Sequence, residues 1–303
     1  MLVQAAADAA GAQQYPAPAL YVVATPIGNL ADLTLRALHV LAIVDAIACE
    51  DTRHSAALLR HFGLSKPLVA VHEHNERAAA AGVIVRLERG ERVACVSDAG
   101  TPAISDPGAV LVAAVREAGY RVVPIPGASS ALAALAVAGD ASARGFCFVG
   151  FVAARGAERA AAIATCMRAR PAQVLFEAPH RIESLAADLA RLGPDRTVTL
   201  GRELTKQFET VATMPAAELP AWFAADTNRA RGEFVLVLHS LPAEVDTASE
   251  DRHDAILAPL LAALPLKQAV ALAAEIAGAP RNALYARALE MKKARAPQGG
   301  DAD

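Results

Sequence analysis

The chain contains little cysteine, and its four cysteines are far apart. Cys49, Cys95, Cys147 and Cys166 form no CxxC pair, and the nearest two are 19 residues apart. Zinc sites and disulfide frameworks use closer or more numerous cysteines, so we expect neither. Cys49 and Cys95 stand inside apolar runs and are expected in the core. This usage predicts a reduced, cytoplasmic protein.

Long hydrophobic runs are also missing, and we expect no secretory signal. Hydrophobic residues make up 54% of the 303 residues, yet no stretch approaches the ~18 apolar residues that a membrane-spanning helix needs. Residues 1–11 contain no Lys or Arg and include Asp8, unlike the start of a secreted protein. Residues 1–17 are rich in Ala, Gln and Pro, and we expect them to be a disordered tail.

Aromatic residues are scarce, at 4% of the chain, and the net charge is -3. Aromatic side chains on which a nucleobase could stack are therefore few. Phe151, Phe176 and Phe208 are candidates, although we expect each of them in the core. The near-neutral charge hides two basic stretches, because residues 144–170 and 281–295 each hold five basic residues and one acid. Such patches fit an enzyme that visits a polyanion, and they fit two solvated helix faces equally well.

Short apolar runs alternate with helical patterns in the first half of the chain. We expect strands at 20–24, 46–49, 68–71, 92–97 and 121–125, and helices at 32–42, around 58–59 and at 106–118. This alternation predicts an α/β fold with a mostly parallel sheet.

The second half predicts a smaller mixed α/β unit followed by helices. Strands are expected at 146–151, 173–176, 197–200, 208–212 and 234–238, with helices at 158–167 and 181–192. Residues 252–290 are rich in Ala and Leu and predict about three short helices, with breaks at Pro265 and Gly278. The expected organisation is a tail at 1–17, α/β domains at 18–142 and 143–240, a linker at 241–251, a helical domain at 252–295 and a tail at 296–303.

Three polar turns follow predicted strands of the first domain. They are TPIGNL (25–30), SDAGTPAISDPG (97–108) and PGASS (126–130). In an open parallel sheet, ligands bind outside the carboxyl ends of the strands, so these turns predict one shared binding site. The first turn is not GxGxxG and the chain has no P-loop, which argues against a dinucleotide or nucleoside triphosphate site.

In their order and their amino-acid sequences, these turns resemble those of the tetrapyrrole methylase superfamily of S-adenosylmethionine-dependent methyltransferases. Within it, TPIGN, EDTRH and FEAPHR are similar to the branch that modifies small-subunit ribosomal RNA. The segments that carry the resemblance are 20–37, 49–63, 72–76, 96–108, 123–139, 175–182, 201–209 and 232–238.

The resemblance implies two α/β domains with S-adenosylmethionine in the cleft between them, a small C-terminal helical domain of helix-turn-helix type, and a homodimer. It implies in-line methyl transfer to the ribose 2'-oxygen of a cytidine in 16S rRNA, with the 30S subunit as the expected substrate. Carried over by position, the cofactor-binding residues are Pro26, Gly28, Asp98, Gly100, Thr101, Ile104, Ser105, Ser129, Ser130, Phe151, Pro179 and Gly232.

A ribose hydroxyl is a weak nucleophile, so a base or a cation beside it should help the transfer. Catalytic candidates are Lys206, Glu177 and Arg181. Lys206 could instead grip a phosphate, Glu177 could form a salt bridge, and Arg181 could bind RNA or pair with Glu177. RNA-binding residues are expected at Arg53, Arg155, Arg281, Arg287, Lys292 and Lys293, where Arg53 could also pair with Glu50.

His72 and His74 have the HxH spacing of some zinc sites, but no third ligand is evident, and we expect no metal. Two other functions stay open. A methylase of a small tetrapyrrole-like molecule would have a wide apolar cleft and no need for basic C-terminal helices. An RNA-binding assembly factor would have decayed turns, whereas all three turns are intact.

Overall fold

The computed structural model describes residues 1–72, 75–242 and 247–295, with side chains left out at 247–252 and 293–295. The chain forms two units, Met1–Leu241 and Pro242–Asp303. Among the described residues, no helix has both the length and the apolar character to cross a membrane.

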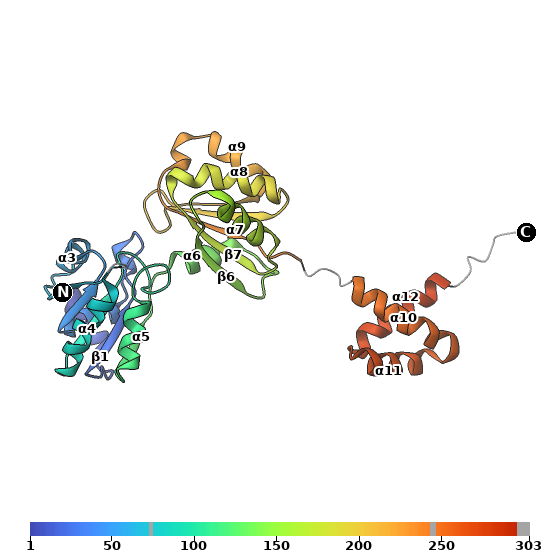
Figure 1. Cartoon of the computed structure of the whole chain (residues 1–303), viewed down its shortest axis with the longest axis horizontal. Coiled ribbons are helices and arrows are strands. Elements are labelled where there is room, and N and C mark those ends of the chain that lie inside the picture. The colour runs from blue at the N-terminus through green and yellow to red at the C-terminus, as the bar shows by residue number, and fades with distance from the viewer. Residues whose placement is uncertain (73–74, 243–246, 296–303) are drawn as a thin grey trace, which may run out of the picture. The chain divides into compact units, whose positions relative to one another are not determined.

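The first sheet is built from five parallel strands in the order β3-β2-β4-β1-β5. Figure 1 labels its strand β1. Its strands are β1 (Ala19–Val23), β2 (Ala46–Cys49), β3 (Leu68–Ala70), β4 (Arg92–Val96) and β5 (Arg121–Ile125). The helices between them are α2 (Leu35–Ile43), α3 (Thr52–His61), α4 (Glu76–Glu88) and α5 (Ala109–Glu117). The predicted parallel α/β fold is confirmed, although α4 was not expected from the sequence.

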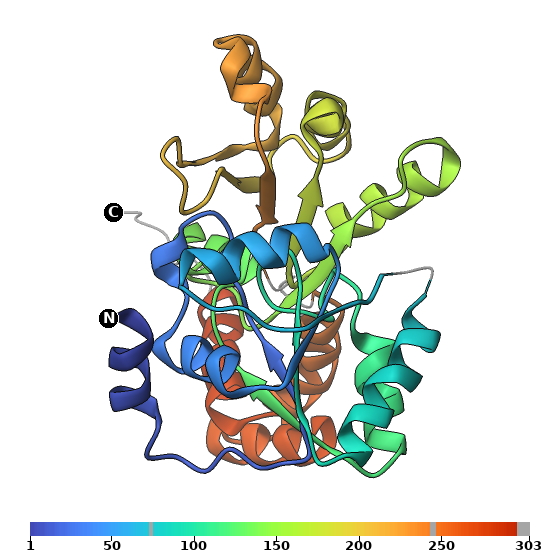
Figure 2. The same cartoon turned by 90° about the vertical axis from the view of Figure 1, so that its left-hand side faces the viewer.

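Helices cover both faces of this sheet because successive residues of a strand point to opposite sides. Tyr21 of β1 packs in a core with α2 and α3, whereas its neighbour Leu20 packs in a second core with α4 and α5. Figure 2 shows α4 and α5 side by side against their face. Cys49 and Cys95 are buried, one in each core, as expected.

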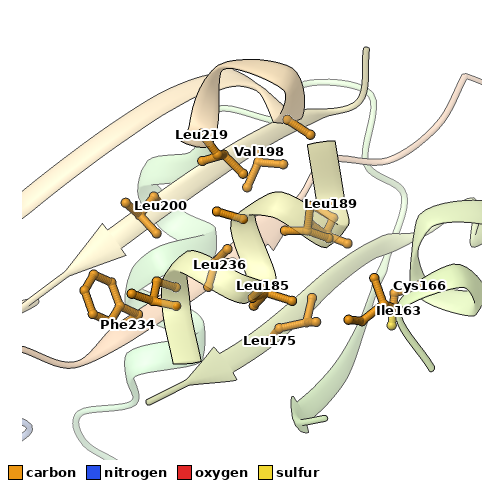
Figure 3. Packing of buried hydrophobic residues seen from close by; sticks show 14 of the residues in the cluster. Ile163, Cys166, Leu175, Leu185, Leu189, Val198, Leu200, Leu219, Phe234 and Leu236 are labelled. Atoms are coloured by element: carbon orange, nitrogen blue, oxygen red, sulfur yellow. The ribbon is translucent and has the colours of Figure 1, made fainter. Parts of the chain in front are cut away.

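The second sheet is mixed, in the order β6-β7-β10-β8-β9. Only its β6–β7 pair is parallel among the described strands. The strands are β6 (Phe146–Phe151), β7 (Ala172–Glu177), β8 (Thr197–Arg202), β9 (Thr210–Pro215) and β10 (Phe234–Leu238). Helices α7 (Gly156–Arg168), α8 (Ile182–Leu192) and α9 (Leu219–Ala224) cover one face. Figure 3 shows Leu185 and Leu189 of α8 within this core.

Helix α6 (Ser130–Ala138) joins the two sheets. It follows β5 in the chain, but Ala134 packs with Val174 and Val235 on the other face of the second sheet. Ile27, from the turn after β1, belongs to the same apolar cluster. The turn after β1 and the second sheet are therefore held by one shared core.

The expected disordered tail at 1–17 is wrong. Residues Leu2–Ala10 form α1, whose Ala6 and Ala10 are buried. The Tyr15 hydroxyl donates to the Ala10 carbonyl, and its ring lies 4.9 Å from that of His39 on α2. Alanine side chains are small enough for two helices to pack closely. The prediction rested on composition alone and missed this packing.

The C-terminal unit contains α10 (Thr247–Ala263), α11 (Leu266–Ala277) and α12 (Arg281–Arg295) around a core that includes Leu257, Val270 and Leu284. Three helices were expected here. Helix α10 begins inside the predicted linker at 241–251, however, and the predicted tail at 296–303 lies outside the described residues.

Candidate active site

A cavity of about 330 Å³ lies where the polar turns of the first sheet meet the second sheet. Its first wall is the turn after β4 and the start of α6. Its second wall is apolar and includes Phe151, Phe176 and Phe234. Eight of the twelve predicted cofactor-binding residues line this cavity: Gly100, Thr101, Ile104, Ser105, Ser129, Ser130, Phe151 and Pro179.

Hydrogen bonds fix the three turns to one another. The Thr25 N–H donates to the Gly100 carbonyl (2.9 Å), and the Gly100 N–H donates back to the Thr25 carbonyl (3.1 Å). The Thr101 hydroxyl donates to the Ala128 carbonyl (3.1 Å), which ties the turn after β4 to the turn before α6. The shared site predicted from the three turns is therefore one connected backbone structure.

Glu76 holds the far end of the turn after β4. Its Oε1 accepts from the backbone N–H groups of Gly108, Val110 and Leu111, at 2.8, 2.9 and 3.1 Å. These groups lie at the start of α5, where a helix leaves N–H groups without partners and favours negative charge. Glu76 belongs to the segment 72–76, which is part of the sequence resemblance, but no role was predicted for it.

A second cavity, of about 270 Å³, adjoins the first. Ile27, Ala99 and Glu233 line both of them. The other three predicted cofactor-binding residues that reach a cavity, Pro26, Gly28 and Asp98, line this smaller one, together with Leu30, His54, Leu58 and Lys206. Gly232 lies outside both cavities.

Lys206 lies in the wall of the smaller cavity between two carboxylates. Its Nζ is 2.9 Å from Glu203 Oε1 and 3.0 Å from Glu233 Oε2. Burial alone would lower the pKa of Lys206, but the hydrogen bonds to Glu203 and Glu233 outweigh burial and raise it above its usual value. Lys206 is therefore held as a cation, which suits it to stabilise negative charge and not to accept a proton.

Two residues of the loop that carries Lys206 have backbone conformations that residues other than glycine rarely adopt. Glu203 and Thr205 have φ of 52° and 68°. Glu203 N–H donates to the Glu233 carbonyl (3.0 Å), and Glu233 N–H donates to Glu203 Oε1 (2.8 Å). Such strained residues persist only where the surroundings hold them, and they cluster at functional sites. Glu203 and Glu233 were not predicted, although both lie in segments of the resemblance.

Gly232 makes room for this arrangement. Its φ is +95°, and a Cβ built there would lie 2.5 Å from Glu203 Cγ. Gly232 was predicted to bind the cofactor. In the structure it lies against the Glu203 side chain instead of lining a cavity.

Glu177 and Arg181 form a buried ion-pair cluster with Arg159. Glu177 Oε2 lies 3.0 Å from Arg159 Nη1, and Oε1 lies 2.9 Å from Arg181 Nε. Arg181 also donates to the Val152 carbonyl (2.7 Å). Both carboxylate oxygens of Glu177 are thus engaged, although the residue borders the larger cavity. Of the two alternatives left by the sequence, this geometry favours a structural salt bridge, and Arg159 was missed.

Carboxylates gather at the ends of β2 and β4. Asp98 Oδ1 accepts from the Asp51 N–H (3.2 Å). Burial, and then Asp98, Asp106 and Asp51, raise the pKa of Glu50. Asp51 differs, because hydrogen bonds from Arg53 lower its pKa to about 2. Arg53 thus pairs with Asp51 (2.9 Å), not with Glu50, and its side chain stays 91% exposed.

The remaining predicted RNA-binding residues differ in how far they are exposed. Arg155 is exposed at the start of α7, and Arg281 and Lys292 are exposed on α12. Arg287 is half-buried and lies 2.7 Å from Asp254, an ion pair between α12 and α10. The side chain of Lys293 lies outside the described residues.

Two phenylalanines expected in the core are on the surface. Phe208 is 68% exposed between β8 and β9, and Phe151 is 58% exposed at the larger cavity. The prediction was wrong for these two because Phe151 ends β6 and Phe208 lies in the loop before β9, positions at which the apolar pattern does not fix burial. Phe176 is half-buried, and its ring centroid is 5.6 Å from that of Phe151.

No group of three His, Cys, Asp or Glu side chains within the described parts of the chain is arranged to hold a metal ion. His74 lies outside the described residues.

Comparison with known families matches residues 19–220 to the tetrapyrrole (corrin/porphyrin) methylases, and residues 246–292 to the RsmI C-terminal HTH domain. The chain belongs to the tetrapyrrole methylase family. It is 50% identical over 275 residues to ribosomal RNA small subunit methyltransferase I of Escherichia coli O157:H7, covering 90% of this chain and 95% of that protein. The protein of that name from Pseudomonas aeruginosa is 48% identical, covering 89% and 96%.

Solved structures of other proteins share the fold. Uroporphyrin-III-C-methyltransferase from Thermus thermophilus aligns with a TM-score of 0.52 and 23% identity, covering 73% of this chain and 94% of that one. Diphthine synthase aligns with a TM-score of 0.57 and 16% identity, covering 73% and 90%. The expected family, fold class, methyltransferase activity and S-adenosylmethionine dependence are confirmed.

Proposed function

We propose that the chain transfers the methyl group of S-adenosylmethionine to the ribose 2'-oxygen of a cytidine in 16S rRNA. The observation that carries the proposal is the Lys206 ammonium, which lines the smaller cavity and is paired with Glu233, a residue that lines both cavities. A reaction that joins a donor in one cavity to an acceptor in the next would take place at this boundary.

The larger cavity fits the methyl donor. Its volume of about 330 Å³ lies in the range of small-molecule sites. Ser129 and Ser130 begin α6, where N–H groups favour a carboxylate such as that of the methionine moiety. Phe151, Phe176 and Pro179 supply an apolar wall for an adenine. When bound, the donor supplies an electrophilic methyl group on a sulfonium.

The protein then has to orient the acceptor and stabilise charge on it. As the C–O bond forms and the S–C bond breaks, the 2'-hydroxyl loses its proton. Glu233, which lines both cavities, is placed to take that proton. Lys206 remains protonated and stabilises the charge that develops on the oxygen, as donors in a preorganised site do.

The charge of the smaller cavity disfavours a tetrapyrrole substrate. Its lining carries two carboxylates, Asp98 and Glu233, against one ammonium, Lys206. A tetrapyrrole precursor with many carboxylates needs the opposite balance. It is also larger than S-adenosylmethionine, whereas this cavity is smaller than the one that fits the cofactor.

The proposal includes the 30S subunit as substrate, a homodimer as the active form and a cytoplasmic location. The names of the relatives, ribosomal RNA small subunit methyltransferase I, support the ribosomal substrate. Exposed apolar side chains on α6 and on the edge strand β6 support self-association: Leu132, Val137 and Phe146.

The test uses the full chain, radiolabelled S-adenosylmethionine and 30S subunits that lack the modification, followed by nucleoside analysis. Label in 2'-O-methylcytidine is the expected result. Label in another nucleoside or on a base would overturn the stated position. If calorimetry shows cofactor binding while neither subunits nor free 16S rRNA take up label, a small-molecule methylase becomes the better proposal.

A further inference from the structure

We infer that the smaller cavity receives the target nucleoside, and that His54 and Leu58 of α3 form the part of its wall that contacts the base. This inference rests on the proposed methylation of RNA. It adds the place of the acceptor and two residues that select it.

The cavity is placed where an acceptor has to be. It shares Ile27, Ala99 and Glu233 with the larger cavity, so a ligand in each would meet across these residues. Lys206 lines this cavity, and its Nζ lies 3.0 Å from Oε2 of Glu233, a residue that lines both cavities. A ribose bound here would bring its 2'-oxygen to both the ammonium and the donor.

The size and charge of the cavity select a nucleoside without its phosphates. Its volume of about 270 Å³ is just below the range of pockets that hold drug-sized ligands. Two carboxylates and one ammonium in the lining would repel a phosphate buried among them. The phosphates would then remain outside, on the side of Arg53, which is next to His54 and extends into solvent.

Helix α3 presents a face suited to a base. His54 and Leu58 are four residues apart, so both lie on one side of α3, and both line the cavity. An imidazole ring stacks on a base, and a leucine gives it an apolar surface. Asp98 also lines the cavity, beside the start of α3, where its Oδ1 accepts from the Asp51 N–H. Its carboxylate is an acceptor for the exocyclic amine that distinguishes cytosine from uracil.

The base must leave its stack to enter such a pocket. Enzymes that act on a nucleotide inside folded nucleic acid extrude it, and RNA proteins read unpaired bases held apart from their neighbours. The cavity therefore predicts an unpaired or extruded target, with recognition of one nucleoside and not of a helix.

The decisive variant is Leu58→Phe, which fills the cavity from α3. The matched control is Ala57→Phe, because Ala57 precedes Leu58 on α3 and is exposed. We expect Leu58→Phe to lower kcat/KM for 30S subunits by about 100-fold, the scale of a misplaced substrate. Its affinity for S-adenosylmethionine, measured by calorimetry, should equal that of the wild type. Ala57→Phe should retain both properties.

His54→Ala tests the same pocket independently, in case Leu58→Phe folds poorly. His54 is on the surface, so its removal should not disturb folding. Loss of a stacking contact should lower kcat/KM by about 10-fold and leave cofactor affinity unchanged. Full activity of either variant would overturn the nucleoside pocket, and so would loss of cofactor affinity together with activity in both. A wild-type chain that binds cofactor but labels no RNA would instead overturn the proposed function itself.

Discussion

Arg159 Nη1 lies 3.0 Å from Glu177 Oε2, and both side chains are almost fully buried. Arg181 Nε lies 2.9 Å from the other oxygen of the same carboxylate. One carboxylate therefore pairs with guanidinium groups from α7 and from the turn after β7. This fixes the turn that borders the larger cavity.

The first prediction is that Glu177→Gln is a stability variant. Without the charge of Glu177, the buried Arg159 keeps only a longer contact with Asp188 (3.7 Å) as its ion pair. Breaking a buried ion pair in this way costs about 3–5 kcal/mol. We expect the free energy of unfolding in urea to fall by that order, while the folded fraction keeps most of its kcat. Unchanged stability with a large loss of kcat would assign Glu177 to catalysis instead.

The second prediction concerns Lys206. Lys206→Met should lower kcat by about 10²–10³, as loss of one stabilising donor does, and leave the affinity for S-adenosylmethionine unchanged. Lys206→Arg keeps the charge and should recover part of the rate. Because the pKa of Lys206 is raised, kcat should show no inflection from Lys206 between pH 6 and 9. A wild-type inflection in that range that disappears in Lys206→Arg would show that Lys206 acts as a base.

The sequence was sufficient to predict the turns but not their partners. Thr25, Gly100 and Ala128 follow apolar runs, and a parallel sheet brings such turns to one edge. The contacts of Lys206 were out of reach, because Glu233 is 27 residues away and approaches only through the pairing of β8 with β10. Arg159 was missed for the same reason. It lies in the Ala-rich helix α7, and its buried partner Glu177 belongs to β7.

The third prediction separates backbone strain from contact at Gly232. Gly232 and Gly119 have similar φ values, +95° and +82°, but an added Cβ would meet the Glu203 side chain only at Gly232. Alanine at either position should cost about 1–2 kcal/mol for the backbone. Gly232→Ala should also displace Glu203 from Lys206 and lower kcat. Equal stability and equal kcat in the two variants would contradict this role.

The fourth prediction is a pH dependence of stability through Asp106. Burial raises the pKa of Asp106 above the usual 3.8. The hydrogen bond with Ser97 lowers the pKa, and the nearby charge of Asp98 raises it, so that the pKa stays raised. An acid whose pKa is higher in the folded chain stabilises it when protonated, and this stabilisation is lost as the pH rises through the raised pKa. Asp106→Asn should therefore unfold at higher urea than the wild type at pH 7. The difference should shrink as the pH falls through the raised pKa, and a wild type that is more stable at pH 7 would refute it.

The fifth prediction concerns Phe208, which lies between β8 and β9, two residues beyond Lys206. Arg202 holds this segment by donating to the carbonyls of Phe208 (3.2 Å) and Arg231 (2.7 Å). An exposed aromatic ring held beside the reacting centre is suited to stack on a base next to the target, which is worth about 1–3 kcal/mol.

Phe208→Ala should therefore weaken binding to 30S subunits by that amount, measured by filter binding at fixed salt. Its unfolding should remain unchanged, because the ring is 68% exposed. Phe208→Trp keeps a stacking surface and should bind at least as tightly as the wild type. If the alanine variant binds as tightly as the tryptophan variant, Phe208 makes no contact with RNA, and the ring serves only to cover the loop that Arg202 holds.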